Sequence, residues 1–140
     1  MYLLDANACI RILNKTSLPL IERLAQHEPS EIRLSSVVKA ELLFGAHRSE
    51  RVRDNLEVLA RFFAPFICLP FDDRCAEEYG LIRAGLTRLG TPIGPNDLMI
   101  AATARAYDLT LVSHNLSEFS RVHGLRVEDW EVGTTPNLSG

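Results

Sequence analysis

The sequence predicts an α/β sandwich built around a mainly parallel sheet of four or five strands. Short apolar runs alternate with longer segments of helical periodicity along the 140 residues. Several of these runs end close to a polar residue and pass into a helical segment, as strands of an open α/β sheet do. The length suits one domain rather than two. Strands that alternate with helices in a single domain favour parallel pairing through crossover connections.

The first half of the chain is expected to alternate strand and helix. Pro19 fits the start of a helix, because the first turn has no use for its missing N–H. A strand that stops at an acid, as the first one does at Asp5, is typical of the carboxyl edge of a parallel sheet. The expected elements are a strand at residues 2–4, helices at 6–13 and 18–27, a strand at 31–35 and a helix at 36–45.

The second half repeats this alternation. Asp72 and Asp73 open a long helix, where they are expected to cap it and to complement its dipole. The expected elements are a helix at residues 49–63, a strand at 66–69, helices at 72–89 and 97–107, and strands at 109–112 and 125–129. Residues 133–140 are rich in Gly, Thr, Pro, Asn and Ser, so we expect one domain at 1–132 and a flexible tail at 133–140.

The composition is that of an ordinary soluble protein, with 46% hydrophobic and 24% charged residues. A net charge of −3 gives no global basic signal for nucleic acid. The three scattered cysteines are expected to be reduced, mostly buried thiols. No apolar run approaches the roughly 18 residues of a membrane span, and no signal peptide is recognisable. We expect a cytoplasmic protein with no membrane partner.

Asp97 opens a helix that is apolar on nearly every side from Leu98 to Tyr107. Such a helix is buried, and an isolated Asp at its start serves most simply as an N-cap. If Asn96 caps the helix instead, the Asp97 oxygens are free for another use. Glu41 lies in an apolar helical stripe, where a carboxylate either reaches out to solvent or needs a cation or partner.

Four acids form one candidate set, because they lie at strand ends or helix faces that a parallel sheet can bring together. They are Asp5, Glu41, Asp97 and Glu118, with Asn7, Ser113 and Asn115 close to them in the chain. No Lys or Arg lies at matching positions to neutralise them. Clustered carboxylates recruit a cation, and oxygen ligands favour Mg²⁺ or Mn²⁺ over zinc. The expected chemistry is metal-assisted hydrolysis of a phosphodiester.

Four motifs along the chain resemble those of the PIN-domain ribonucleases, and most closely the VapC-type toxins of type II toxin–antitoxin pairs. The resemblance runs from about Tyr2 to Trp130. The motifs are Leu4-Asp5-Ala6-Asn7, the segment from Ser35 to Ala46 around Glu41, Ile93-Gly94-Pro95-Asn96-Asp97 with Ile100-Ala101, and the block from Leu111 to Trp130 that contains Ser113, Asn115 and Glu118.

This resemblance implies a PIN-like three-layer α/β/α sandwich and a Mg²⁺- or Mn²⁺-dependent endoribonuclease that cleaves tRNA or rRNA. It implies that Asp5, Glu41 and Asp97 bind the metal, with Glu118 as the fourth acid, although many relatives carry an Asp where this chain has Asn115. Asn7 and Ser113 are implied to orient the acids. The implied partners are a second copy of the chain and a VapB-like antitoxin, with DNA contacted only through the antitoxin in a toxin–antitoxin hetero-oligomer.

Residues that hold the RNA are harder to predict. Candidates on helices or turns that could border the groove are Arg11, Lys15, Lys39, Arg83 and Arg88, and each is otherwise a solvated surface charge. His114 is left without a role, because a metal-generated hydroxide needs no histidine base.

Two other functions remain open. A phosphoacceptor receiver domain needs an acidic pair after the first strand, an Asp after the third strand and a later Lys. This chain has Asp5 alone, then Leu69-Pro70, and no suitable Lys after Lys39. A PIN-like binding module without catalysis is the second alternative, and the presence of all four acids argues against it.

Overall fold

The computed structural model describes residues 1–132, so the tail predicted at residues 133–140 lies outside the described residues. Five strands form one parallel sheet in the order β3-β2-β1-β4-β5. They are β1 (Tyr2–Leu4), β2 (Ile32–Ser35), β3 (Ile67–Leu69), β4 (Thr110–Val112) and β5 (Val127–Glu128). The prediction of a mainly parallel sheet of four or five strands is confirmed.

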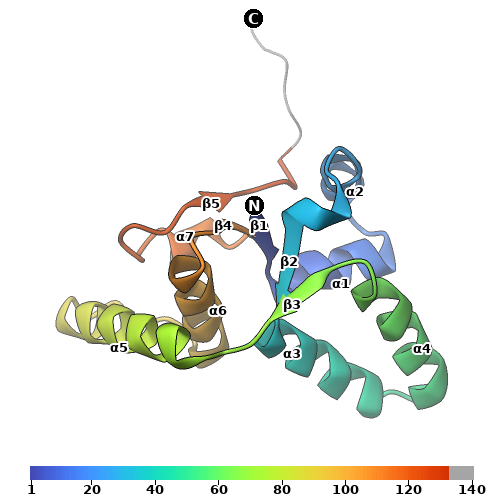
Figure 1. Cartoon of the computed structure of the whole chain (residues 1–140), viewed down its shortest axis with the longest axis horizontal. Helices are drawn as coiled ribbons and strands as arrows, with labels where there is room; N and C mark the ends of the chain where they lie inside the picture. Colours follow the sequence, from blue (N-terminus) through green and yellow to red (C-terminus); the bar gives the residue numbers. More distant parts are fainter. Residues whose placement is uncertain (133–140) are drawn as a thin grey trace, which may run out of the picture.

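Within residues 1–132, seven α-helices and a short 3₁₀ helix (Pro29–Glu31) connect the strands. The α-helices are α1 (Ala6–Asn14), α2 (Leu18–Ala25), α3 (Ser36–His47), α4 (Val52–Phe63), α5 (Asp73–Arg88), α6 (Pro95–Ala106) and α7 (Leu116–Phe119). Helices α5 and α6 pack together on one side of the strands, while α1, α2 and α4 lie on the other (Figure 1). Helix α3 contacts both α1 and α6. None of the helices in residues 1–132 combines the length and the apolar character that crossing a membrane requires.

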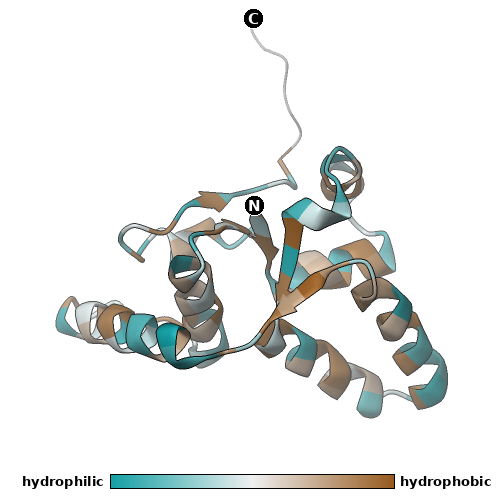
Figure 2. Ribbon diagram, viewed as in Figure 1, coloured by the Kyte–Doolittle hydropathy of each residue, from teal (hydrophilic) through white to brown (hydrophobic). Residues whose placement is uncertain are grey.

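The helix ends follow local sequence signals. Asp5 caps α1 by accepting the Ala8 N–H at 2.8 Å, and the Ser35 hydroxyl accepts the Val38 N–H at the start of α3. Asp72 caps α5, as predicted, by accepting the Cys75 N–H at 3.1 Å. In Figure 2 the end of α5 next to β3 is accordingly hydrophilic, whereas α3 is mostly hydrophobic.

Helix α6 lies in the core, which confirms the burial predicted from its composition. Its buried residues include Leu98, the run 100–104 and Ala106. The leucines of β1, Leu3 and Leu4, are fully buried in the same hydrophobic core. Of the three thiols, Cys9 and Cys75 are buried and Cys68 is half-buried, and none forms a disulfide.

Trp130 anchors the end of the described chain. Its side chain is 1% exposed, and its indole N–H donates to Glu128 at 2.9 Å. The His27 ring stacks on it at 4.9 Å between centroids, and Tyr2 meets it edge-on at 5.0 Å. This contact ties the segment after β5 to β1 and to the residues after α2.

Replacing this indole is expected to destabilise the fold. Trp130→Ala should lower the free energy of unfolding by about 3–5 kcal/mol, because a large buried side chain leaves a cavity. Trp130→Phe keeps an aromatic ring for the stack and should cost about half as much. Urea unfolding followed by circular dichroism measures both, since Trp130 is the only tryptophan. Equal midpoints for Trp130→Ala and wild type would contradict this role.

Candidate active site

The candidate site lies where the strand order changes direction. The chain adds β2 and β3 on one side of β1, and β4 and β5 on the other. Open α/β sheets form a crevice at such a switch point, outside the carboxyl ends of the strands. Leu4 pairs with Val112 at the ends of β1 and β4, so Asp5 and Ser113 follow the two strands side by side.

Asp5 is a buried carboxylate, with 4% of its surface exposed. Burial raises its pKa above the ordinary value, while the hydrogen bonds from Ser113 and the Ala8 N–H, and the charge of Arg11, lower it in part. The side chain is thus held in one position by two hydrogen bonds, one of them the cap of α1.

Glu41 lies on α3 and faces the same site. Its Oε1 atom is buried and has no hydrogen-bond partner among the residues that the structure describes. Burial raises the pKa of Glu41, and the negative charge of Asp5 raises it further, against the opposing effect of the Asn96 side chain. A buried, unpaired carboxylate oxygen is costly, and a cation is one way to satisfy it.

Asp97 lies in the first turn of α6. Its pKa is raised to about 6, first by burial and then by the negative charges of Glu118, Asp5 and Glu41. The other three predicted acids therefore all act on Asp97 at a single edge of the sheet. In the absence of a cation, burial and this repulsion keep a proton on Asp97 up to about pH 6.

The start of α6 corrects one prediction. The N-cap residue is Gly94, without a side-chain cap, so Asn96 does not cap the helix and instead acts on Glu41. Pro95 takes the first helical position, where its fixed φ suits the helix, and this moves the cap two residues ahead of Asn96. Asp97 is still free of the capping role, but because Gly94 is the N-cap residue and not because Asn96 caps the helix.

Glu118 lies on α7 and holds the loop in front of α6. Its Oε1 accepts the Gly94 N–H at 2.8 Å, and its Oε2 accepts from the Asn115 side chain at 3.0 Å. The Gly94 N–H is the main reason that the pKa of Glu118 is lowered. Glu118 and Asp97 interact directly, and their pKa values move in opposite directions, with that of Asp97 raised and that of Glu118 lowered.

The polar residues predicted to support the acids differ in where they lie. Ser113 is 1% exposed and contacts Asp5, and its hydroxyl accepts the Asn115 N–H at 3.0 Å. Asn115 reaches Glu118. Asn7 is exposed in the first turn of α1, two residues after Asp5, and within residues 1–132 its side chain makes no hydrogen bond.

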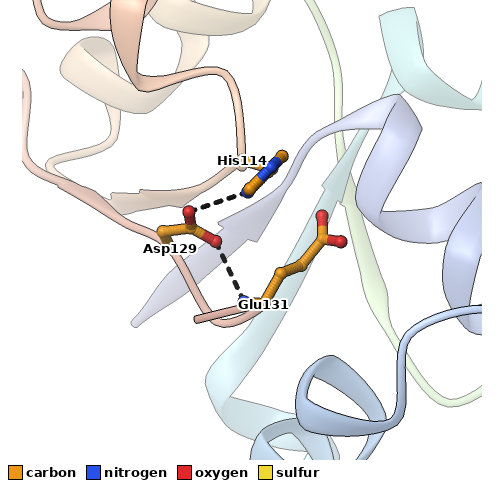
Figure 3. A group of neighbouring side chains, drawn as sticks. All are labelled: His114, Asp129 and Glu131. Atoms are coloured by element: carbon orange, nitrogen blue, oxygen red, sulfur yellow. Dashed lines mark hydrogen bonds and ion pairs between the residues drawn. The ribbon is translucent and has the colours of Figure 1, made fainter. Parts of the chain in front are cut away.

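A second group beside the site was missed from the sequence. His114 Nδ1 lies 2.8 Å from Asp129 Oδ2, and the Glu131 carboxylate lies next to them (Figure 3). Glu131 pairs with Arg11 at 2.9 Å, and both charges act on the pKa of Asp5. The expectation that no Lys or Arg matches the acids is therefore wrong for Arg11. Asp129 and Glu131 follow β5, so the strand-end argument that selected Asp5 could have found them.

Comparisons with known proteins identify the family. The profile of the PIN domain matches residues 2–125. The tRNA(fMet)-specific endonuclease VapC of Shigella flexneri is 40% identical over 129 residues, covering 92% of this chain and 97% of the relative. Ribonuclease VapC2 of Haemophilus influenzae is 39% identical over 129 residues, with 92% and 97% coverage.

Solved structures agree with this result. The chain resembles a chain in the structure of VapBC2 from Rickettsia felis bound to a promoter DNA fragment. The TM-score is 0.86 and the identity 34%, and the match covers 92% of this chain and 98% of the other. It also resembles a chain in the structure of DNA-bound VapBC from Salmonella typhimurium. The TM-score is 0.87 and the identity 38%, and the match covers 92% of this chain and 97% of the other. The family result removes the receiver-domain alternative. The chain belongs to the PIN-domain family, among its VapC-type ribonucleases.

Proposed function

We propose that the chain is the toxin of a type II toxin–antitoxin pair, an endoribonuclease that cleaves tRNA or rRNA with Mg²⁺ or Mn²⁺ bound by Asp5, Glu41, Asp97 and Glu118. The observation that carries this proposal is the meeting of the four acids at the switch point of the sheet, with Glu41 Oε1 buried and unpaired. The S. flexneri relative is named for cleavage of tRNA(fMet). Since tRNA and rRNA are cytoplasmic, we place the protein there.

The donor set fits a hard divalent cation. All four candidate ligands are carboxylates, and Mg²⁺ and Mn²⁺ prefer oxygen. Burial and mutual repulsion raise the pKa values of Asp5, Glu41 and Asp97, which is the electrostatic condition that a cation relieves. A divalent cation bound here would activate water and shield the charge on the phosphate during cleavage.

The protein's own residues position these ligands. Ser113 and the Ala8 N–H hold Asp5 through hydrogen bonds. Glu118 keeps a free lone pair on each oxygen while it fixes Gly94 and Asn115, so it can contribute to the metal site and hold the loop that precedes Asp97. We propose that Asn7, two residues after Asp5, also supports this acid through its exposed side-chain amide.

Glu118→Gln tests this dual role. We expect a loss of activity of roughly 10–100-fold, as for other groups that orient metal ligands. Removing the Glu118 charge should also lower the pKa of Asp97, because that charge is the second largest cause of its rise. The acid limb of the pH–activity profile should then move to lower pH, whereas Glu22→Gln, an exposed change on α2, should leave it in place. An unmoved limb in Glu118→Gln would show that the two carboxylates act independently.

A groove beside the acids supports the proposed antitoxin partner. It has a volume of about 470 Å³ and is lined by residues of α1, α3 and α4, with Ile10, Leu13 and Val58 among its apolar walls and Glu41 also in its lining. Ile10 and Val58 are each 41% exposed. We propose that a segment of a VapB-like antitoxin binds this groove and reaches Glu41. Toxin homodimers then join the antitoxin in a hetero-oligomer, which contacts DNA only through the antitoxin.

We propose that residues 1–132 form the whole nuclease domain.

Purified protein should cleave total cellular RNA with Mg²⁺ or Mn²⁺ and should not cleave it in EDTA. Sequencing of the 5′ ends of the fragments identifies the target. Cleavage that persists in EDTA would overturn the metal-dependent function. RNA binding without any cleavage would instead favour the non-catalytic alternative.

A further inference from the structure

We infer that a hollow beside the acids, between α5 and the loop before α6, binds one nucleotide of the RNA next to the cleaved bond. This inference rests on the proposed ribonuclease function. The hollow has a volume of about 290 Å³. That is just below the roughly 300–1,000 Å³ of small-molecule sites, a size that suits a single nucleotide.

One helical stripe supplies the polar wall of the hollow. Tyr79, Arg83 and Thr87 lie four residues apart on α5 and therefore share a face. The Arg83 guanidinium donates to the Tyr79 hydroxyl at 3.0 Å and lies 5.8 Å from the centre of its ring. Phe71 packs edge-on against the other part of that ring at 6.2 Å, which fixes its plane.

An aromatic ring beside a guanidinium suits an unpaired nucleotide. Unstacked bases in RNA stack on aromatic side chains, and arginine binds phosphate. No acidic residue lines the hollow. Arg83 is the one charged residue in its lining, and within residues 1–132 it forms no ion pair with a carboxylate, although the whole chain is acidic. The charge of the hollow thus complements an anionic ligand.

The opposite wall connects the hollow to the acids. Pro92 and Pro95 line it, and Gly94 between them donates its N–H to Glu118. Arg121 donates to the Pro92 carbonyl at 3.0 Å, and its charge helps to lower the pKa of Glu118. Pro95 also begins the helix that carries Asp97. The loop that lines the hollow is therefore the same loop that contacts Glu118 and leads to Asp97.

The test measures binding without cleavage. A short unstructured oligoribonucleotide carrying a fluorescent label is titrated in EDTA and followed by anisotropy. Arg83→Gln and Tyr79→Leu should each weaken binding about tenfold, through lost phosphate contact and lost stacking. Tyr79→Phe keeps the ring, and Arg61→Gln removes an exposed charge on the distant α4, so both should stay within about twofold of wild type. Since Arg83 is exposed, Arg83→Gln remains informative even if Tyr79→Leu fails to fold.

The outcomes separate this inference from the proposed function. Cleavage by Arg83→Gln with an unchanged KM, or equal weakening by Arg83→Gln and Arg61→Gln, overturns the nucleotide site and leaves the ribonuclease standing. No cleavage by wild type, with Arg83-dependent RNA binding, removes the ribonuclease and keeps the site. If Arg83→Gln and Tyr79→Leu change the molar mass by light scattering and leave RNA binding intact, the hollow is a contact between copies, and the inference is wrong.

Discussion

Asp97→Asn is expected to lower the rate of RNA cleavage about a thousandfold while the protein remains folded. The substitution keeps the size and shape of the side chain and removes its negative charge. Asp97 is the acid on which the charges of Asp5, Glu41 and Glu118 all act, so its loss weakens cation binding at the centre of the set. Single-turnover cleavage of the mapped RNA target, with Mn²⁺ in excess, measures the effect.

The same substitution should stabilise the metal-free protein. The pKa of Asp97 is about 6 in the folded state against 3.8 ordinarily, so between these values the folded protein binds the additional proton. Stability therefore falls as the pH rises through this window, and the full cost is present above pH 6. Allowing for solvent screening of a half-buried group, the cost is about 1 kcal/mol, and Asp97→Asn should raise Tm at pH 7.5 by about 3 °C in EDTA.

A matched control makes this result specific. Asp54→Asn changes an exposed acid on α4 and should alter neither cleavage nor the melting temperature in EDTA. Full cleavage by Asp97→Asn would remove Asp97 from the site. A lower Tm for Asp97→Asn in EDTA would show that the ionised Asp97 stabilises the fold without metal. That result would contradict its raised pKa.

Chelation of metal is expected to abolish cleavage, and restoring Mn²⁺ should both return activity and stabilise the fold. At a concentration 100 times its Kd, a ligand that binds only the folded state adds about 2.7 kcal/mol, or roughly 8 °C for a domain of this size. Differential scanning fluorimetry with and without Mn²⁺ measures this shift. The Glu41→Gln variant, which neutralises the unpaired buried oxygen, should show a much smaller one.

The rise in Tm caused by Mn²⁺ should be smaller at low pH. Cation binding requires ionised carboxylates, and Asp97 is protonated below about pH 6. Lowering the pH from 7.5 to 5 should weaken the affinity about tenfold, so the same Mn²⁺ concentration adds only about 1.4 kcal/mol. A thermal shift that is equal at the two pH values would argue that Asp97 does not bind the cation.

Local chemistry made most of the fold predictable. Asp5 ends an apolar strand, the apolar composition of α6 required burial, and Asp72 occupies a typical capping position; the structure agrees on all three. The boundaries differ by a few residues at the ends of helices, where the last turn is held by few hydrogen bonds. For example, α4 begins at Val52 rather than at residue 49.

The interactions around the acids could not be predicted from local sequence patterns. Glu118 holds the Gly94 N–H across 24 positions of the chain, and Arg11 pairs with Glu131 across 120. Such contacts depend on the order in which strands enter the sheet, and short-range periodicity carries no information about that order. The role assigned to Asn96 failed for a related reason, because the true cap depended on where Pro95 let the helix begin.

The sequence by itself determined the alternation of strands and helices, the acids at their ends and the family resemblance. Each of these depends on residues that are close together in the chain. Only the tertiary structure decided that β1 and β4 are neighbours, which sets Asp5 beside Ser113 at the switch point. It also decided which acid has a raised pKa, Asp97, and which a lowered one, Glu118. That depends on burial and on distances between charges, and both exist only once the chain has folded.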